Sequence, residues 1–166
     1  MFGSILELQV EVKQVFSDQF SFIQIFQKRE VDYKSMDKLP YVNSYKDLLV
    51  YTKSRDLSRK IFRISKDFPS DEIYSLTSQI RRSSRSVGAQ IAEAWAKRFY
   101  KRHFISKLTD SDAEVNETEH WIKIAHDCGY MDQENTLILT DACREIGRLL
   151  GGMINKADIF CEKKPS

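Results

Sequence analysis

The chain has 166 residues, 42% hydrophobic and 30% charged, and this composition suits one domain built around a single core. Its net charge of +2 excludes a polycation that coats nucleic acid indiscriminately. With 6 glycines and 3 prolines and with both signs of charge mixed along the sequence, it is also unlike an all-β or a disordered protein, so we expect mostly helix.

Cysteine usage and hydropathy bear on the compartment. The three cysteines are odd in number and widely separated, which is typical of reduced thiols rather than of a disulfide framework or a zinc site; they are Cys128, Cys143 and Cys161. No stretch reaches the roughly 18 apolar residues of a membrane helix, and no signal peptide is recognisable. We therefore expect a cytoplasmic protein that contacts no membrane.

Residues 1–40 differ from the rest and form an N-terminal extension of poorly specified structure. Leu6–Lys13 alternates apolar and polar residues, as a half-buried strand does, yet a lone strand has no partner in a helical bundle. Two interpretations remain open. Met36 is the genuine start and the upstream residues are misassigned, or residues 1–35 form an arm that orders on binding a partner.

The first helix is predicted over residues 45–67. Its apolar seam repeats at seven, four, three and four residues and is widened by three further apolar side chains; the seam is Val50, Leu57, Ile61, Ile64 and Phe68, with Leu48, Leu49 and Phe62 beside it. Pro69 disfavours helical geometry at the residue before it, and Ser70 is expected to cap the next helix.

The second helix, residues 71–99, is expected to be the packing hub. Its apolar residues Ile80, Val87, Ile91 and Ala94/Trp95 fall on one side. Several residues in the middle are small, which lets another helix approach closely; they are Ser83, Ser84, Ser86, Gly88, Ala89 and Ala92.

A third helix is predicted over residues 103–127 and a fourth over 133–160. The inner face of the third includes Ser111 and Thr118, so that seam is unusually polar. Gly129 supplies a C-cap and Asp132 an N-cap between the two helices. Three glycines in the fourth suggest close approach of a neighbour, namely Gly147, Gly151 and Gly152. The prediction is an all-α, antiparallel up-down-up-down four-helix bundle over residues 41–161, followed by a polar tail, 162–166.

The stretch Gln79–Arg98 resembles the signature of the four-helix-bundle family first met as reading frames in intervening sequences of bacterial 23S ribosomal RNA genes. Gln90 and Ala94 stand where that family usually has Asn and Gly. The resemblance spans about residues 45–154, and the matching residues are Gln79, Ile80, Arg81, Arg82, Ser86, Ile91, Ala92 and Glu93. It implies a turn near residues 98–102, a homopentameric ring, and a distant similarity to the accessory protein of diversity-generating retroelements, which works with a reverse transcriptase and nucleic acid.

No catalytic or metal-binding constellation stands out. Glu117 and His120 have the Glu-x-x-His spacing of di-iron bundles, but neither His103 nor His126 supplies the second copy which that chemistry needs. Phosphate loops, nucleophile elbows and paired Cys-x-x-Cys motifs are absent from the sequence. We expect a protein that is not an enzyme and needs no metal or cofactor.

Charge is distributed unevenly. Residues 81–107 hold eight bases and one acid, whereas 110–119 hold five acids and no base. Arg82, Glu93 and Glu114 are predicted to join a partly buried charge network. The residues predicted to form a basic patch that contacts phosphates are Arg85, Lys97, Arg98, Lys101 and Arg102.

The sequence thus predicts a self-associating, non-enzymatic accessory factor that binds RNA or DNA. A protein partner such as a reverse transcriptase is implied by the resemblance alone. The alternative is a protein-interaction scaffold without nucleic-acid binding, which docks a partner on the acidic face of residues 110–119 or on the N-terminal extension.

Overall fold

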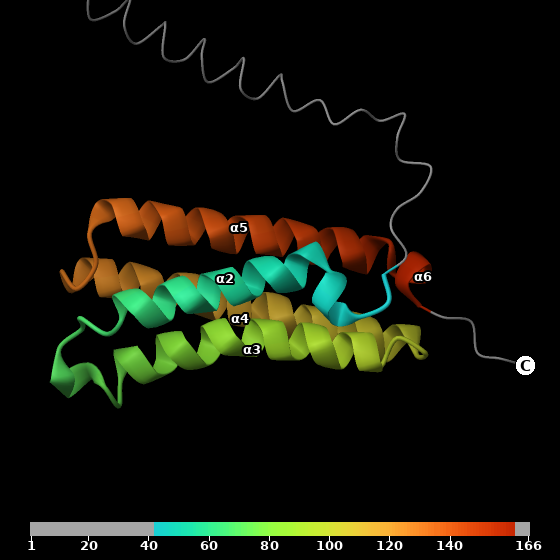
Figure 1. Ribbon diagram of the computed structural model, residues 1–166, viewed down its shortest axis with the longest axis horizontal. Coiled ribbons are helices and arrows are strands. Elements are labelled where there is room, and N and C mark those ends of the chain that lie inside the picture. Colours follow the sequence, from blue (N-terminus) through green and yellow to red (C-terminus); the bar gives the residue numbers. More distant parts are fainter. Residues whose placement is uncertain (1–41, 162–166) are drawn as a thin grey trace, which may run out of the picture. The chain divides into compact units, whose positions relative to one another are not determined.

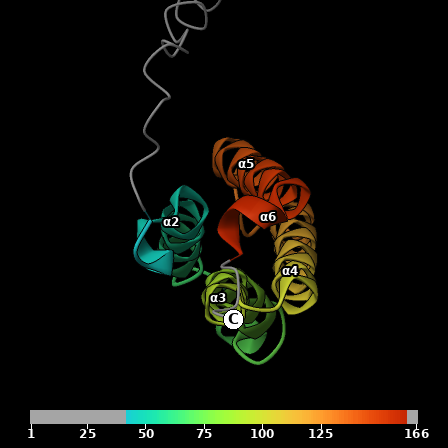
Figure 2. The same cartoon turned by 90° about the vertical axis from the view of Figure 1, so that its right-hand side faces the viewer.

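The computed structural model describes residues 42–161, and the predictions on Leu6–Lys13, Met36 and the polar tail lie outside this range. Four long helices run side by side and alternate in direction (Figure 1). An end-on view shows them in chain order around the core, each beside the next and the last beside the first (Figure 2). The predicted antiparallel four-helix bundle is confirmed. In chain order the elements are η2 (Tyr45–Asp47), α2 (Leu49–Ile64), η3 (Ser70–Glu72), α3 (Leu76–Ala96), α4 (Lys101–Asp127), α5 (Gln133–Asn155) and α6 (Ala157–Phe160).

The helix boundaries near α2 and α3 differ from the predicted ones. Residues 45–47 form a separate 3-10 turn, because Leu48 is extended and interrupts the helix. The prediction that Ser70 caps the next helix is wrong, since Ser70 begins η3. The N-cap residue of α3 is Ser75, whose side chain makes no capping hydrogen bond, and the Leu76 amide donates instead to Glu72 Oε2 at 3.2 Å. Hydrogen bonds from Ser75 and this amide lower the pKa of Glu72.

The connection from α4 to α5 is confirmed in detail. Gly129 has a φ of +74°, and its amide donates to His126 at 2.8 Å while the Tyr130 amide donates to Ala125 at 2.9 Å. These two backbone hydrogen bonds form the pattern of a Schellman C-cap, which needs a residue in the left-handed conformation. Asp132 then caps α5 by accepting from the Asn135 amide at 2.7 Å.

The chain also turns after α3, as the family resemblance implied. No glycine or proline marks this turn, and Tyr100 takes the extended conformation that separates the two helices. The predicted fourth helix is divided, because Lys156 leaves the helical region between α5 and α6.

The core follows the predicted faces closely. Ile80, Val87, Ile91 and Ala94 of α3 are all fully buried. The predicted inner face of α4 coincides with its buried residues, which are Phe104, Leu108, Ser111, Val115, Thr118, Ile122 and Ala125. Leu49 and Phe62 are exceptions to the prediction for α2, because 58% and 40% of their surfaces are exposed.

Another helix approaches closely at the small residues of α3, as predicted, but not at the glycines of α5. A Cβ on Gly88 of α3 would lie 3.2 Å from Ser54 Oγ of α2, so the small residue is what admits α2 here. For Gly151 and Gly152 the predicted close approach is not found within residues 42–161, where an added Cβ would meet no atom of another helix within 4 Å. At Gly147 an added Cβ would make only ordinary contact, 3.4 Å from Asp112 Oδ1.

The polar seam between α3 and α4 is hydrogen-bonded within the core. Ser111 Oγ donates to the Val87 carbonyl at 3.0 Å. Thr118 Oγ1 lies 3.0 Å from Ser83 Oγ and 2.7 Å from the Glu114 carbonyl. Because these hydroxyls are small and paired, the two helices pack closely without leaving a buried hydroxyl of the seam unpaired.

Candidate nucleic-acid interface

The five cationic residues predicted to contact phosphate do not form one patch. Lys97, Arg98, Lys101 and Arg102 lie around the turn from α3 to α4. Arg85 lies in the middle of α3 and, at 1.5 Å per residue, about 18 Å from Lys97 along the helix axis. The prediction of a single patch is wrong, because a long helix spreads a basic stretch of sequence over its length.

The cations at the turn are held in different ways. Arg98 packs its guanidinium over the rings of Trp95, at 4.4 Å from the centroid, and Phe99, at 5.3 Å, and donates to the Trp95 carbonyl at 3.0 Å. Lys101 forms an ion pair with Asp158 at 2.7 Å, so its charge is offset within the chain. Lys97 and Arg102 are exposed.

Arg85 belongs to a cluster at the other end of the α2–α3 contact. Three cations surround the exposed ring of Phe62: Lys66 and Arg81 at 5.1 Å from its centroid and Arg85 at 5.8 Å. Arg81 is fixed there by two hydrogen bonds to Ser65, from Nε to Oγ at 2.7 Å and from Nη2 to the carbonyl oxygen at 3.0 Å. The cluster therefore combines a half-exposed apolar ring with three positive charges.

These clusters lie along one line, which we call the α2–α3 seam. It comprises the flanks of the two helices that face each other, with residues spaced three or four apart and thus on one side of each helix. Tyr51 lies over Gly88 within the seam, and Arg55 packs on the Tyr51 ring at 6.0 Å. The seam is made of Tyr51, Arg55, Ser58, Phe62 and Lys66 from α2 and the turn after it, and of Arg81, Arg85, Gly88, Ala92, Trp95 and Arg98 from α3 and the turn after it.

The seam repeats one chemical unit three times. An aromatic ring carries at least one cation at Phe62, at Tyr51 and at Trp95. None of the seam residues is acidic, and five of them are cations. An arrangement of alternating rings and positive charges can stack bases and neutralise phosphates.

A hollow of about 590 Å³ adjoins the Phe62 end of the seam. Arg81 and Arg85 belong to both, and Arg82 adds a third guanidinium to the hollow. Tyr74 stands at its edge with 94% of its surface exposed. The remaining lining is three hydroxyl side chains and two apolar ones, namely Thr77, Ser78, Ser86, Ile73 and Ala89.

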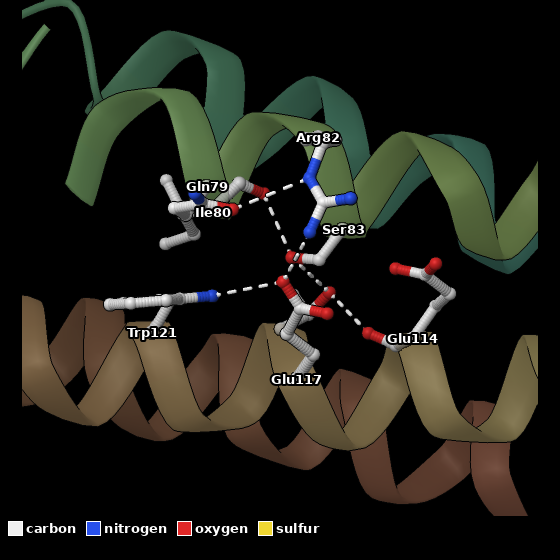
Figure 3. Close-up of polar contacts among 8 residues, drawn as sticks. Gln79, Ile80, Arg82, Ser83, Glu114, Glu117 and Trp121 are labelled. Carbon is white, nitrogen blue, oxygen red and sulfur yellow. Dashed lines mark hydrogen bonds and ion pairs between the residues drawn. The ribbon is translucent and has the colours of Figure 1, made fainter. Parts of the chain in front are cut away.

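The predicted charge network of Arg82, Glu93 and Glu114 is not assembled as expected. Arg82 forms its ion pair with Glu117 at 3.0 Å and is largely exposed (Figure 3). Glu93 instead pairs with Lys107 at 3.1 Å. Trp121 also donates to Glu117 through Nε1 at 3.2 Å. The pairing differs because Arg82 of α3 reaches α4 at Glu117, and Glu114 lies about one helical turn before that residue.

Glu114 itself remains beside this ion pair. The Glu114 Oε2 atom is buried and has no hydrogen-bond partner among residues 42–161. Burial raises the pKa of Glu114, and the neighbouring Glu117 raises it further, while Arg82 opposes both.

The acidic face of residues 110–119 is largely neutralised within the chain. Asp110 pairs with Lys107 at 3.1 Å, Glu117 with Arg82, and Glu119 with Lys123 at 2.7 Å. Glu117 is thus engaged by two partners rather than available beside His120. In the part of the chain that the structure describes, no three His, Cys, Asp or Glu side chains lie close enough together to hold a metal ion.

Sequence reasoning missed the contribution of α2 to this surface. Arg55 and Phe62 on α2 and Lys66 on the turn after it were not among the predicted site residues, and neither was Tyr74, which follows η3. A signal was present: Tyr51 and Arg55, like Phe62 and Lys66, are spaced four apart, so each ring and its cation share one side of a helix. What the spacing did not reveal is that these pairs face α3.

The fold and this surface define a class of protein, an antiparallel four-helix bundle with a cation-rich aromatic seam along one helix pair. The model of the 23S rRNA-intervening sequence protein family matches residues 46–152, and the chain belongs to that family. A crystal structure of a protein with unknown function from the S23 ribosomal protein family of Bacteroides thetaiotaomicron is similar, with a TM-score of 0.58 and 30% identity over 64% of this chain and 95% of that one. No curated protein matches the chain.

None of the helices described in residues 42–161 combines the length and apolar character that crossing a membrane requires.

Proposed function

We propose that this chain is a non-enzymatic, self-associating accessory protein that binds single-stranded RNA or DNA along the α2–α3 seam. The observation that supports this most is the threefold repetition of an aromatic ring with its cation over Phe62, Tyr51 and Trp95. The family match supports it only in its name, which refers to ribosomal RNA.

The chemistry of the seam favours a single strand over a duplex. Single-strand binders combine a positive track for the backbone with rings on which bases stack, and each stacked base contributes about 1–3 kcal/mol. A duplex keeps its bases stacked on each other and offers the rings nothing. Among the three rings of the seam, Phe62, at 40% exposed, is the most accessible to a base.

Self-association is supported by apolar side chains outside the core. The bundle exposes large hydrophobic residues at several places, and such groups on a small protein favour contact with another subunit; they include Leu49, Ile73, Leu137, Ile138 and Ile159. The pentameric state follows from the family resemblance, and a ring would repeat the seam in each subunit. Arg102 and Lys97 would extend the positive surface at the turn.

Binding to short oligonucleotides tests the proposal. Fluorescence anisotropy at about 50 mM salt is expected to show the protein binding an eight-nucleotide single strand more tightly than the matching duplex. Phe62→Ser is expected to weaken single-strand binding about tenfold, because it removes a stacking ring. Ile138→Ser on α5 is the matched control, since Ile138 is 44% exposed and lies off the seam. Because Ile138 is also one of the apolar side chains that support self-association, size-exclusion chromatography checks that both variants keep the oligomeric state of the parent protein.

The alternative of a pure protein scaffold makes the opposite prediction. No binding of either oligonucleotide at low salt would reject the nucleic-acid function and leave the scaffold. Equal loss in the Phe62 and Ile138 variants would reject the seam as the binding surface.

A further inference from the structure

The geometry points to a specific use of the hollow beside Arg81: we propose that it binds the terminal phosphate monoester of a nucleic-acid strand whose end base stacks on Tyr74. The inference rests on the proposed function, because the strand is taken to lie along the α2–α3 seam. Of the five residues predicted from the sequence to contact phosphate, only Arg85 lines this hollow.

Three guanidiniums border the hollow, and two of them have no carboxylate partner among residues 42–161. Arg81 is bound to the neutral Ser65, and Arg85 packs on Phe62. Arg82 is paired with Glu117, whose charge offsets its own. The net positive charge in the hollow therefore suits a dianion such as a phosphate monoester better than the single charge of an internal phosphodiester.

The size and the lining of the hollow suit a nucleotide. Its volume of about 590 Å³ lies in the range of small-molecule sites. Ser78 and Ser86 supply hydroxyls beside the arginines, and Thr77, which also lines it, has a buried Oγ1 without a hydrogen-bond partner in the described chain. Tyr74 offers an open ring face at the edge, because 94% of its surface is exposed.

The position of the hollow favours a strand end rather than a passing strand. Arg81 and Arg85 link it to the seam on one side. Asp71 and Glu72 of η3 directly precede Ile73 and Tyr74 of the lining in the chain, so a strand that continued past Tyr74 would bring a phosphate toward two carboxylates. Because like charges repel, the backbone is expected to stop at the hollow.

The test compares three forms of one eight-nucleotide single strand: with hydroxyls at both ends, with a 5′-phosphate and with a 3′-phosphate. A phosphate at one of the two ends is expected to raise affinity about tenfold, as charge-assisted hydrogen bonds to arginine imply. Adenosine 5′-monophosphate is titrated separately, to distinguish a strand end from a free nucleotide.

Two variants move the phosphate preference in opposite directions. Arg82→Gln is expected to reduce the ratio of phosphorylated to unphosphorylated affinity several-fold, while leaving binding of the hydroxyl strand unchanged, since Arg82 is off the seam. Glu117→Gln is expected to increase the ratio, because it releases Arg82 from its ion pair and keeps an acceptor for Trp121. Tyr74→Ser is expected to weaken binding of the phosphorylated strand, and thermal unfolding checks that each variant is folded.

Equal affinity for all three strands would overturn the inference and leave the proposed function standing. The same holds if Arg82→Gln and Glu117→Gln leave the ratio unchanged. If no strand binds but adenosine monophosphate does, and Arg82→Gln abolishes this, the proposed function fails while the hollow remains a nucleotide site. If the affinity for adenosine monophosphate is the same in Arg82→Gln, Glu117→Gln and the parent protein, the assignment of the hollow is overturned.

Discussion

The salt dependence of single-strand binding gives the sharpest measure of the α2–α3 seam. Each phosphate neutralised on a single strand contributes about −0.7 to the slope of log K against log salt. The seam offers five cations, so a strand that contacts all of them should show a slope of about −3.5. Raising salt from about 50 to about 200 mM should then weaken binding roughly 100-fold.

The double variant Lys66→Gln with Arg85→Gln tests this count. Both side chains pack on the exposed Phe62 ring, and neither donates a hydrogen bond between α2 and α3 within residues 42–161. The slope is expected to fall by about 1.4, to roughly −2.1, because two counterion releases are lost. The assay is fluorescence anisotropy of an eight-nucleotide strand over a salt series, with unfolding midpoints checked for both proteins.

The matched control removes two arginines from another face. Arg144→Gln with Arg148→Gln on α5 changes the net charge by the same amount, and both residues border a different hollow, between α2 and α5. Its slope is expected to stay near −3.5. A similar fall in both double variants would show that total charge, and not the seam, governs binding. An unchanged slope in the seam variant would refute the reasoning directly.

Three further predictions concern the bundle itself. Gly88→Val should destabilise the fold by about 1–3 kcal/mol, because even its Cβ would lie 3.2 Å from Ser54 Oγ. Gly151→Ala should instead stabilise the fold by up to about 1 kcal/mol, since that helical position is open. A denaturant titration that ranks the two variants in the other order would contradict the packing of α2 on α3. Thr118→Val should cost about 1–2 kcal/mol, measured in the same way, because it leaves Ser83 Oγ without its buried partner across the helices; an unchanged midpoint would show that this contact contributes nothing. Burial raises the pKa of Cys143 to about 12. The free energy of unfolding should therefore fall as pH rises above about 9, because the unfolded chain loses the thiol proton first. In the folded protein, iodoacetamide should label the exposed Cys128 before the buried Cys143, and equal labelling by mass spectrometry would contradict that burial.

Local sequence determined the secondary structure and the core faces. The apolar residues of α3 and α4 recur at helical spacing, and that periodicity alone identified which side of each helix is buried. The cap at Gly129 was predictable for the same reason, since a left-handed residue and an N-capping Asp132 act within a few residues of chain. An error arose at Ser70, which begins a 3-10 turn, while the first amide of α3 is satisfied by Glu72.

Tertiary structure decided which charged and aromatic residues share a surface. Arg82 finds Glu117 rather than Glu114, and Arg85 joins Lys66 around Phe62 rather than the cations at the turn. These choices depend on the rotation and relative height of α2, α3 and α4, which are set by the packing of buried residues far apart in the sequence. Periodicity specifies the buried stripe of each helix. Only the packing of these stripes against each other fixes which exposed flanks become neighbours, and the α2–α3 seam and the hollow are formed by such neighbouring flanks.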